Sequence, residues 1–547
     1  MARSASPDAS LEKASTDVEK DGDVQVLAAS INESLAAAEG IDVQFMAKAG
    51  VINGALEECG MGRFQWELFC SAGFGYFSDN IWLQSIAIIM PYVAIEDNFP
   101  GYPKIRMATF AMYMGLVPGA LFWGMTADVI GRRLAWNSTL FISAVFGLAA
   151  GASPNFYVLC VMLALNGIGT AGNMVLDGAV FLEFIPNTHK YLLTLLSVWW
   201  AIGQVVASLI CWVFIAKYSC DTERVGIDGY RCDRNTNPGW RYSMYTLGAM
   251  MLFLWALRFF LLPMQESPKF LVSIGQDEEA VRVIHAVAKK NGRISTLTVE
   301  HIREAAAPFA DKDANSEAKT KFSSWQLVKR SFSHFDTVHL RGLFATPRLA
   351  FSSGLIIAIF GMLGLAYPLF NGFLSGFLQA KGAERGDTSV DATYSTYTYQ
   401  AACGIAGSIL ATFLVEWGKG GRKFAGAFFT VGAGAFLFGL TSVRTAAAVN
   451  GLTCMAALFE NAFYGVIYAI APETFPTPHR GTGDALAGGF QRLCGAAAPL
   501  IATYSAAADS PNGPVYASAA IFIVAGLSML ALPIETRGRT TPMHVLI

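Results

Sequence analysis

The sequence predicts an all-α membrane protein with twelve transmembrane helices, arranged as two similar bundles of six. Three observations predict this fold: twelve long apolar runs, a low content of charge, and a repeat that relates the two halves of the chain. Of the 547 residues, 53% are hydrophobic and 15% are charged, whereas a soluble chain carries about 25% charged residues. The formal net charge of −2 gives no indication of a nucleic-acid partner.

Each apolar run is long enough to cross a bilayer, which takes about twenty residues. Glycine and proline occur inside the runs, as membrane helices tolerate. The first six runs cover 68–94, 107–127, 134–152, 156–182, 191–216 and 242–263. The other six cover 349–378, 396–416, 424–442, 446–471, 482–507 and 514–533.

Lysine and arginine in the short loops predict the orientation, because cytosolic loops are enriched in them. Every second gap between runs is basic, through Arg132, Arg133, Lys190, Lys419, Arg422, Lys423, Arg480, Arg537 and Arg539. This pattern places both termini in the cytosol and the 217–241 loop outside. That loop contains Cys220 and Cys232, which can pair in an oxidising compartment, although their spacing shows only that a disulfide is possible.

The composition divides the chain into five segments. No basic stretch followed by an apolar one occurs near residue 1, so we expect no cleaved signal peptide. A polar leader of this composition is typically disordered. We predict a mostly disordered cytosolic tail (1–65), an N-terminal bundle (66–263), a cytosolic linker with short helices (264–348), a C-terminal bundle (349–534) and a cytosolic C-terminal tail (535–547).

The two halves share a repeat at a constant offset. Gly131-Arg132-Arg133 after run two recurs as Gly421-Arg422-Lys423 after run eight. Glu183, which ends run four, recurs as Glu473, which ends run ten. The offset 422 − 132 equals 473 − 183, namely 290. A duplicated six-helix unit explains the match, and such repeats place a solute site near the bilayer midplane between the halves.

These motifs resemble the major facilitator superfamily, in particular its sugar-porter branch and the synaptic-vesicle-glycoprotein-like relatives with their fungal members. Gly124-x-x-x-Asp128-x-x-Gly131-Arg132-Arg133 matches the superfamily's loop after the second helix. The segments 266–271 (ESPKFL) and 533–539 (PIETRGR) resemble those that follow helices six and twelve of sugar porters. The resemblance covers roughly residues 66–540 and implies the fold of that family, with alternating access to a central site.

The resemblance also implies a cytosolic gate of ion pairs that holds the halves together in one state and opens in the other. The alternative is that the basic residues only anchor helix ends to the cytosolic side. The predicted gate residues are Asp128, Arg132, Arg133, Glu183, Glu266, Glu416, Arg422, Lys423, Glu473, Arg480 and Glu535.

Ionisable residues inside the runs are candidates for function, because a charge at the bilayer centre costs roughly 2.5–3.5 kcal/mol on insertion scales. Asp79 lies in the middle of run one and is the predicted proton-coupling residue; alternatively, it is a structural partner of a neighbouring helix. Arg492 lies inside run eleven and can bind an anionic solute bidentately. Its alternatives are a salt bridge with Glu460 and a cap on nearby carbonyls.

Further polar residues in the runs are predicted to line the solute cavity. Asn173 and Asp177 are four apart, hence on one helix face, and Asp177 serves either the cavity or the cytosolic cluster. Run seven lacks the paired glutamines with which sugar porters bind a hexose, so hexose is not the expected solute. The full set of cavity candidates is Gln204, Asn173, Asp177, Tyr367, Asn371, Glu460, Tyr464, Gln491 and Arg492.

The sequence therefore predicts a secondary-active carrier of a small polar organic solute, namely an organic acid, a polyol or a sugar-like molecule. We expect proton-coupled uptake by a monomer in the lipid bilayer of the plasma membrane. The alternatives are a proton antiporter that exports a metabolite or drug, and a nutrient sensor that does not transport. No nucleophile–base arrangement, metal-ligand spacing or phosphate-binding loop occurs in the central segment 264–348, so we do not expect an ATP-driven pump. We also expect no enzymatic activity, cofactor or metal.

Overall fold

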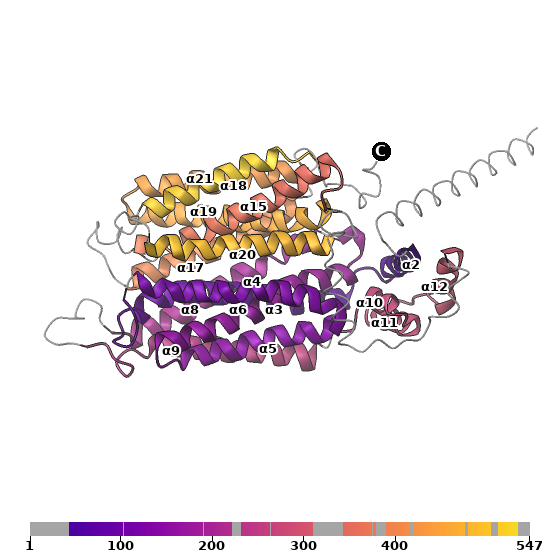
Figure 1. Cartoon of the computed structure of the whole chain (residues 1–547), viewed down its shortest axis with the longest axis horizontal. Helices are drawn as coiled ribbons and strands as arrows, with labels where there is room; N and C mark the ends of the chain where they lie inside the picture. Colours follow the sequence, from indigo (N-terminus) through magenta and orange to yellow (C-terminus); the bar gives the residue numbers. More distant parts are fainter. Residues whose placement is uncertain are drawn as a thin grey trace, which may run out of the picture.

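The computed structural model describes residues 43–101, 103–189, 191–220, 231–262, 264–309, 343–374, 376–378, 390–415, 421–475, 480–504 and 512–533. Twelve long helices of these residues run side by side along one axis (Figure 1). The N-terminal six form one layer and the C-terminal six form the other. This arrangement confirms the predicted all-α fold of two six-helix bundles.

The helices follow the predicted apolar runs closely. The N-terminal bundle contains α3 (Arg63–Val93), α4 (Met107–Ile130), α5 (Arg132–Gly151), α6 (Phe156–Phe184), α8 (Val198–Tyr218) with the short α7 (Leu192–Leu195) before it, and α9 (Gly239–Ala256). The C-terminal bundle contains α15 (Pro347–Asn371), α17 (Val390–Val415), α18 (Gly421–Ser442), α19 (Ala446–Thr474), α20 (Arg480–Tyr504) and α21 (Gly513–Leu530).

Ten of the described helices are long and apolar enough to cross a membrane. The two long helices outside this set are α3 and α20. They carry Asp79 and Arg492 near their middles, together with other polar residues. Their lower hydropathy thus arises from the same polar side chains that mark them as candidates for function.

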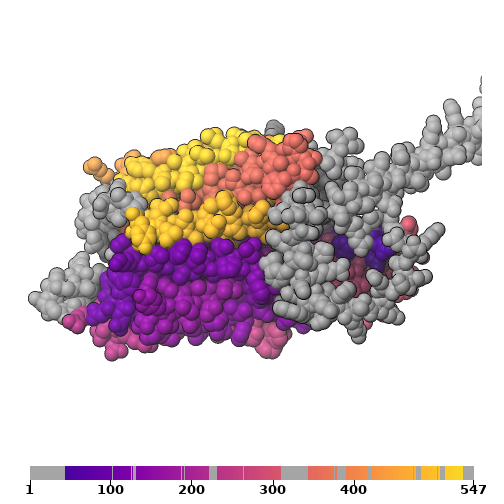
Figure 2. Space-filling view, viewed as in Figure 1, coloured from indigo at the N-terminus to yellow at the C-terminus, as the bar shows by residue number. Residues whose placement is uncertain are grey.

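The two bundles meet along two helix pairs. α4 packs against α20, and α8 packs against α17. The space-filling view shows α20 lying directly on the N-terminal bundle along a continuous seam (Figure 2). α3, α6, α15 and α19 contribute further residues to the space enclosed between these pairs.

We call the end of the bundle that carries the Cys220–Cys232 loop the outer end, and the opposite end the inner end. At the outer end, three contacts join the bundles. The Tyr394 hydroxyl donates to the Ile88 carbonyl oxygen at 3.2 Å. The indole of Trp212 donates to Asp391 at 2.7 Å. In addition, the Arg106 guanidinium lies 4.3 Å from the centre of the Phe373 ring.

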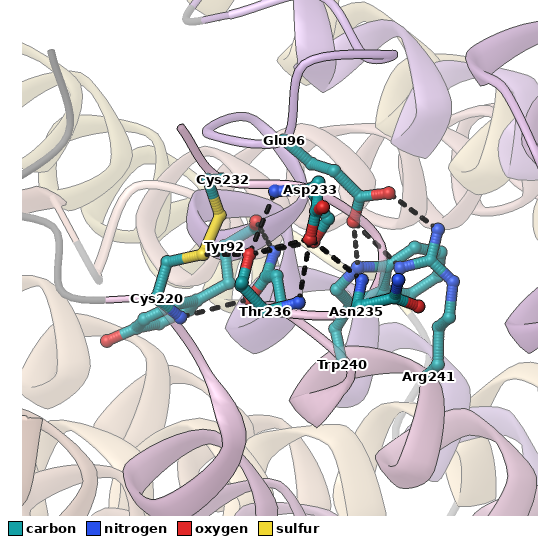
Figure 3. Close-up of polar contacts among 10 residues, drawn as sticks. Tyr92, Glu96, Cys220, Cys232, Asp233, Asn235, Thr236, Trp240 and Arg241 are labelled. Carbon is teal, nitrogen blue, oxygen red and sulfur yellow. Dashed lines mark hydrogen bonds and ion pairs between the residues drawn. A yellow bond between two sulfur atoms is a disulfide. The ribbon is translucent and has the colours of Figure 1, made fainter. Parts of the chain in front are cut away.

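The 217–241 loop is closed by a disulfide, and hydrogen bonds and an ion pair fasten its end to the end of α3 (Figure 3). Cys220 and Cys232 are joined by a disulfide, with their Cα atoms 6.0 Å apart. The Glu96 carboxylate binds both terminal nitrogens of Arg241 at 2.7 Å and accepts from the indole of Trp240 at 3.0 Å. Glu96 is 2% exposed and Arg241 3%, so each charge depends on the other for its solvation.

A tight turn within this loop is held by Asp233. Its carboxylate accepts from the backbone N–H groups of Asn235 and Thr236, at 3.0 and 2.9 Å. These hydrogen bonds from Thr236 and Asn235 to the ionised form hold the pKa of Asp233 below its ordinary value. The turn leads directly into Asn237, whose side chain donates to the Tyr92 carbonyl oxygen at 2.7 Å.

At the inner end, a helix occupies part of the leader that we predicted to be mostly disordered. α2 (Val43–Cys59) packs on α10 (Pro268–Ser273), α11 (Asp277–Lys290) and α12 (Val299–Ala306). Its apolar residues share one core with these helices, and Lys48 pairs with Asp277 at 2.8 Å. α2 is ordered because this partner surface, which the leader's sequence does not reveal, buries its apolar face.

The Glu96–Arg241 pair yields a prediction on stability. Replacing Arg241 by Met leaves a buried carboxylate without its cation, which costs about 3–5 kcal/mol. We therefore expect the R241M variant to unfold at a clearly lower temperature than the wild type in detergent micelles. R234Q, a substitution of an exposed arginine in the same loop, is the control. An equal transition temperature for the two variants would contradict the assigned role of the pair.

Candidate functional site

A buried ion pair joins the two bundles at mid-height. Arg492 on α20 donates to Asp79 on α3, with 3.2 Å between Nη2 and Oδ1. The two residues are 7% and 6% exposed, respectively. Asp79 is the seventeenth of the 31 residues of α3, and Arg492 is the thirteenth of the 25 of α20, so both lie far from either helix end. The partner of Arg492 is therefore Asp79, and not Glu460, which was the alternative partner predicted from the sequence.

The ion pair forms part of the wall of a central cavity between the bundles. The cavity spans about 580 Å³, which includes the open space at its mouth, and takes residues from both halves. Its lining residues are Asp79, Asn80, Leu83, Tyr113, Met174, Trp200, Gln204, Gly364, Tyr367, Pro368, Asn461, Tyr464, Tyr468, Gln491 and Arg492. Of the cavity candidates chosen from the sequence, Gln204, Tyr367, Tyr464, Gln491 and Arg492 lie on this wall, as does Asp79.

Amide and phenol groups on the wall of the cavity form hydrogen bonds with one another. Gln204 donates to Asn80 at 3.0 Å and to the Tyr367 hydroxyl at 2.6 Å; the latter bond joins the two bundles. The Tyr468 hydroxyl donates to Gln491 at 2.6 Å. The wall therefore offers donors and acceptors that a polar solute can engage by exchanging partners.

The aromatic side chains of the wall form a connected cluster. The ring of Trp200 lies 6.0 Å from that of Tyr464 and 5.1 Å from that of Tyr468. The rings of Tyr367 and Tyr464 are 5.5 Å apart. These faces provide apolar area for the carbon skeleton of a solute, while the polar groups at their edges fix its orientation.

A second cavity, of about 590 Å³, lies beside the first. The two share Leu83, Tyr113, Tyr367 and Pro368 as common wall residues. Arg106 and Phe373, which meet at the outer end, line the second cavity. The two cavities therefore lie in series toward the outer end, separated by the two tyrosines.

Two cavity candidates lie elsewhere, within the N-terminal bundle. Asp177 is fully buried and pairs with Arg258 and the indole of Trp136. The Arg258 guanidinium also donates to the Ser71 carbonyl oxygen at 2.8 Å and lies 3.6 Å from the centre of the Trp136 ring. Asp177 is thus the counter-charge of a buried arginine. It lines neither the cavity nor the inner-end cluster, which corrects both sequence interpretations.

Asn173 is likewise fully buried, and its amide lies 3.4 Å from the Ser78 hydroxyl. Ser78 in turn contacts Ser143 at 3.2 Å. Asn173 therefore belongs to the packing between α3, α5 and α6, not to the cavity wall. The sequence predicted the shared helix face of Asn173 and Asp177 but not which neighbour that face meets.

Glu460 and Asn371 form a buried polar cluster behind the cavity wall. The Asn371 amide approaches the Glu460 carboxylate at 3.5 Å and accepts from Gln400 at 2.9 Å. Asn371 lines the second cavity, whereas Glu460 lines neither of the two. Its neighbour Asn461 lies on the wall of the central cavity instead.

At the inner end, the described gate residues of the N-terminal half contact one another. Arg132 pairs with Glu183. Glu266 accepts from the backbone N–H groups of Arg132 and Arg133, at 3.1 and 3.3 Å, and so satisfies the first turn of α5. Gly131 precedes this turn with φ of 90°, a left-handed conformation that glycine adopts without strain.

The other predicted gate residues are only partly described. The Lys423 ammonium donates to the Leu532 carbonyl oxygen, and Arg422 is buried at 6% exposure. Glu416 and Glu535 lie outside the described residues, as do the side chains of Asp128, Glu473 and Arg480. These contacts of the described gate residues thus brace each half, and a gating role remains a prediction.

Nine lining residues are not among the candidates chosen from the sequence: Asn80, Leu83, Tyr113, Met174, Trp200, Gly364, Pro368, Asn461 and Tyr468. Asn80 and Leu83 follow Asp79 by one and four positions, so the helical period places them near its face. That periodicity could have identified them. Tyr113 and Met174 gave no such signal, because an aromatic or thioether side chain in an apolar run is equally typical of packing.

The arrangement combines one positive charge, one negative charge and several amides with aromatic faces. Arginine can bind a carboxylate bidentately, but in this state its partner is Asp79. A solute anion must therefore compete with Asp79 for the guanidinium, and protonation of Asp79 removes the competitor. Among the described residues, no cluster of His, Cys, Asp and Glu could hold a metal ion.

The chain is similar to known transporters over most of its length. MFS siderochrome iron transporter 1 of Ceriporiopsis subvermispora (strain B) is 44% identical, covering 92% of this chain and 93% of the relative. An uncharacterised MFS-type transporter of Schizosaccharomyces pombe is 39% identical, with coverages of 91% and 90%. The synaptic vesicle 2-related protein of Rattus norvegicus is 24% identical, with coverages of 89% and 82%.

Solved structures share the fold. The proton:xylose symporter XylE bound to 6-bromo-6-deoxy-D-glucose matches with a TM-score of 0.62 at 15% identity, covering 87% of this chain and 98% of that one. A partially occluded inward-open form of XylE from E. coli matches with a TM-score of 0.61 at 16% identity. Residues 68–457 match the Major Facilitator Superfamily. The chain therefore belongs to the major facilitator superfamily of membrane transporters.

Proposed function

We propose that this transporter carries a small polar organic solute together with a proton, and that the solute is an organic acid. The observation that carries the proposal is the Asp79–Arg492 ion pair on the wall of the cavity between the bundles. A permanent positive charge at this depth is costly unless it is paired. A solute carboxylate is the chemical group that can replace Asp79 as its partner.

The pair provides a simple physical coupling between proton and solute. While Asp79 is ionised, it occupies the guanidinium of Arg492, and an anionic solute binds weakly. A proton on Asp79 neutralises it and leaves Arg492 available for the solute anion. Binding of the anion then restores a paired charge in the cavity, so that proton and anion cross together without an uncompensated charge.

The contacts at the outer end and the ion pairs at the inner end support a rocking movement of the two halves. Contacts from Ile88 to Tyr394 and from Trp212 to Asp391 close the outer end. The inner-end pairs, such as Arg132–Glu183, brace the N-terminal half so that it moves as one body. We propose that the predicted gate residues of the two halves alternate with these outer contacts as the transporter changes state.

The orientation and location are part of the same proposal. The outer end faces the exterior of the cell, because the basic loops lie at the inner end and the Cys220–Cys232 disulfide is typical of an oxidising compartment. Both termini and the helices α2 and α10–α12 are cytosolic. The protein acts as a monomer in the plasma membrane, with segments 66–263 and 349–534 as its two bundles.

Two rival functions predict different fluxes. A proton antiporter would move preloaded solute out of vesicles against a proton gradient but would not accumulate it. A nutrient sensor would bind solute without net movement in either direction. The same vesicle experiment distinguishes all three, because the direction of the imposed pH gradient selects symport or antiport.

The proton role of Asp79 predicts a loss of acid stimulation in Asp79→Asn. In proteoliposomes screened with organic acids, polyols, sugars and a siderochrome, we expect acid outside to accelerate the uptake of an organic acid by the wild type. D79N should take up the same solute at a rate that no longer depends on the pH gradient. Asp97→Asn, at an exposed position after α3, should behave like the wild type.

The results that would contradict this are distinct. If D79N keeps the acid stimulation of the wild type, then Asp79 is not the coupling residue. If neither protein accumulates solute but both export it against a proton gradient, the antiport function replaces our proposal.

The solute-binding role of Arg492 predicts a charge-selective defect. Charge-assisted hydrogen bonds contribute about 1.5–3 kcal/mol, so Arg492→Gln should weaken the binding of an organic acid by about ten- to a hundred-fold. Uptake kinetics would show this as a raised KM. Arg444→Gln, an exposed arginine of the same half, serves as control. An equal loss for neutral and anionic solutes would assign Arg492 to structure instead.

A further inference from the structure

Glu460 is a buried acid without a counter-charge. It lies in the middle of α19 and is 1% exposed. Its Oε1 atom has no hydrogen-bond partner among the described residues, and Oε2 has a single long contact of 3.5 Å from the Asn371 amide. The other three buried acids of the described residues, Asp79, Glu96 and Asp177, each pair with an arginine.

The surroundings of Glu460 offer amides, phenols and rings. From α15 the facing groups are Asn371 and the Tyr367 phenol. Gln400 on α17 donates to the same Asn371 amide. On α19 itself the nearest titratable group is Tyr464. Toward α18 the helix presents Phe459, which packs on phenyl rings.

The remaining neighbours also provide no positive charge to Glu460. On α20, Arg492 pairs with Asp79 across the cavity, and Gln491 bonds to Tyr468. α7 approaches α19 at Gly465 with Thr194 and Ser197. Within the described part of the chain, the buried carboxyl group therefore has no cationic side chain to stabilise a charge.

We propose that Glu460 is a second proton-binding site, which holds a proton in this state of the transporter. An isolated carboxylate in an apolar interior costs far more than a neutral carboxyl group, and no described partner offsets that cost. Asn371 suits such a site, because an amide carries both a donor and an acceptor. A half-turn of its side chain lets it donate to the carboxylate or accept from the carboxyl group.

The position of the site links it to the solute path. Asn371, which contacts Glu460, lines the second cavity, and Tyr367 lines both cavities. Rearrangement of these residues as the halves rock would admit water to the carboxyl group, which then loses its proton as hydronium. The consequence for coupling rests on the proposed function, whereas the proton on Glu460 is measurable without any solute.

Infrared difference spectroscopy of the purified protein in lipid tests the inference. A protonated carboxyl group has a C=O stretching band that is separate from the carboxylate bands. We expect this band in the wild type at neutral pH, and we expect Glu460→Gln to remove it. Asp79→Asn should retain the band, because the proposal assigns it to Glu460, whereas Asp79 forms an ion pair with Arg492. An unchanged band in E460Q, or its loss only in D79N, would overturn the proposal.

A second measurement keeps the test decisive if E460Q does not fold. Wild-type protein labelled with ¹³C at the side-chain carboxyl of glutamate should show the band shifted to lower frequency, whereas labelling of aspartate should leave it in place. A band that moves only with aspartate labelling would exclude Glu460 as its source. In flux experiments, E460Q should move one proton fewer per solute than the wild type. If the wild type itself shows no flux, that result contradicts the proposed function and not the proton on Glu460.

Discussion

The structure depends on the pairing of charged side chains that are buried inside its membrane-spanning bundles. Asp79 and Arg492 lie near the middle of their helices and are almost fully buried, so each would be costly without the other. Because one belongs to each half, their attraction draws the bundles together around the cavity that they line. Any event that changes the charge of Asp79 therefore changes the interaction between the halves.

The remaining buried pairs act differently, because each joins helices of the same half. Asp177–Arg258 ties α6 to the end of α9, and Glu96–Arg241 fastens the end of α3 to the start of α9. α2 and α10–α12 add a packed layer at the inner end. These contacts brace the N-terminal half internally, whereas the seam between the bundles is formed where α4 meets α20 and α8 meets α17.

The sequence predicted the fold because hydropathy, loop charge and the 290-residue offset are properties of local segments. Predicted runs such as 156–182 and 446–471 differ from the helices Phe156–Phe184 and Ala446–Thr474 by three residues at most. The cavity was predicted in part, since polar residues in apolar runs such as Asp79 and Gln204 stand out by composition. Which of them share a wall depends on helix rotation and packing.

The sequence could not predict which buried acidic and basic residues pair with each other. Arg258 lies in the last part of the predicted run 242–263, where a basic residue is typical of a helix end, yet the structure buries it against Asp177. For Arg492 the acidic partner considered from the sequence was Glu460, whereas the structure pairs it with Asp79. The helix α2 was missed because its apolar face becomes favourable only against α11 and α12.

The central claim is that the charge on Asp79 controls the fit between the halves. Spin labels at Leu134→Cys and Phe424→Cys, exposed positions near the inner ends of α5 and α18, would measure the distance between the bundles in a background without the free cysteines. We predict that acidification changes the distance distribution and that Asp79→Asn reproduces the acid distribution at neutral pH. A distribution that responds to neither change would contradict the account.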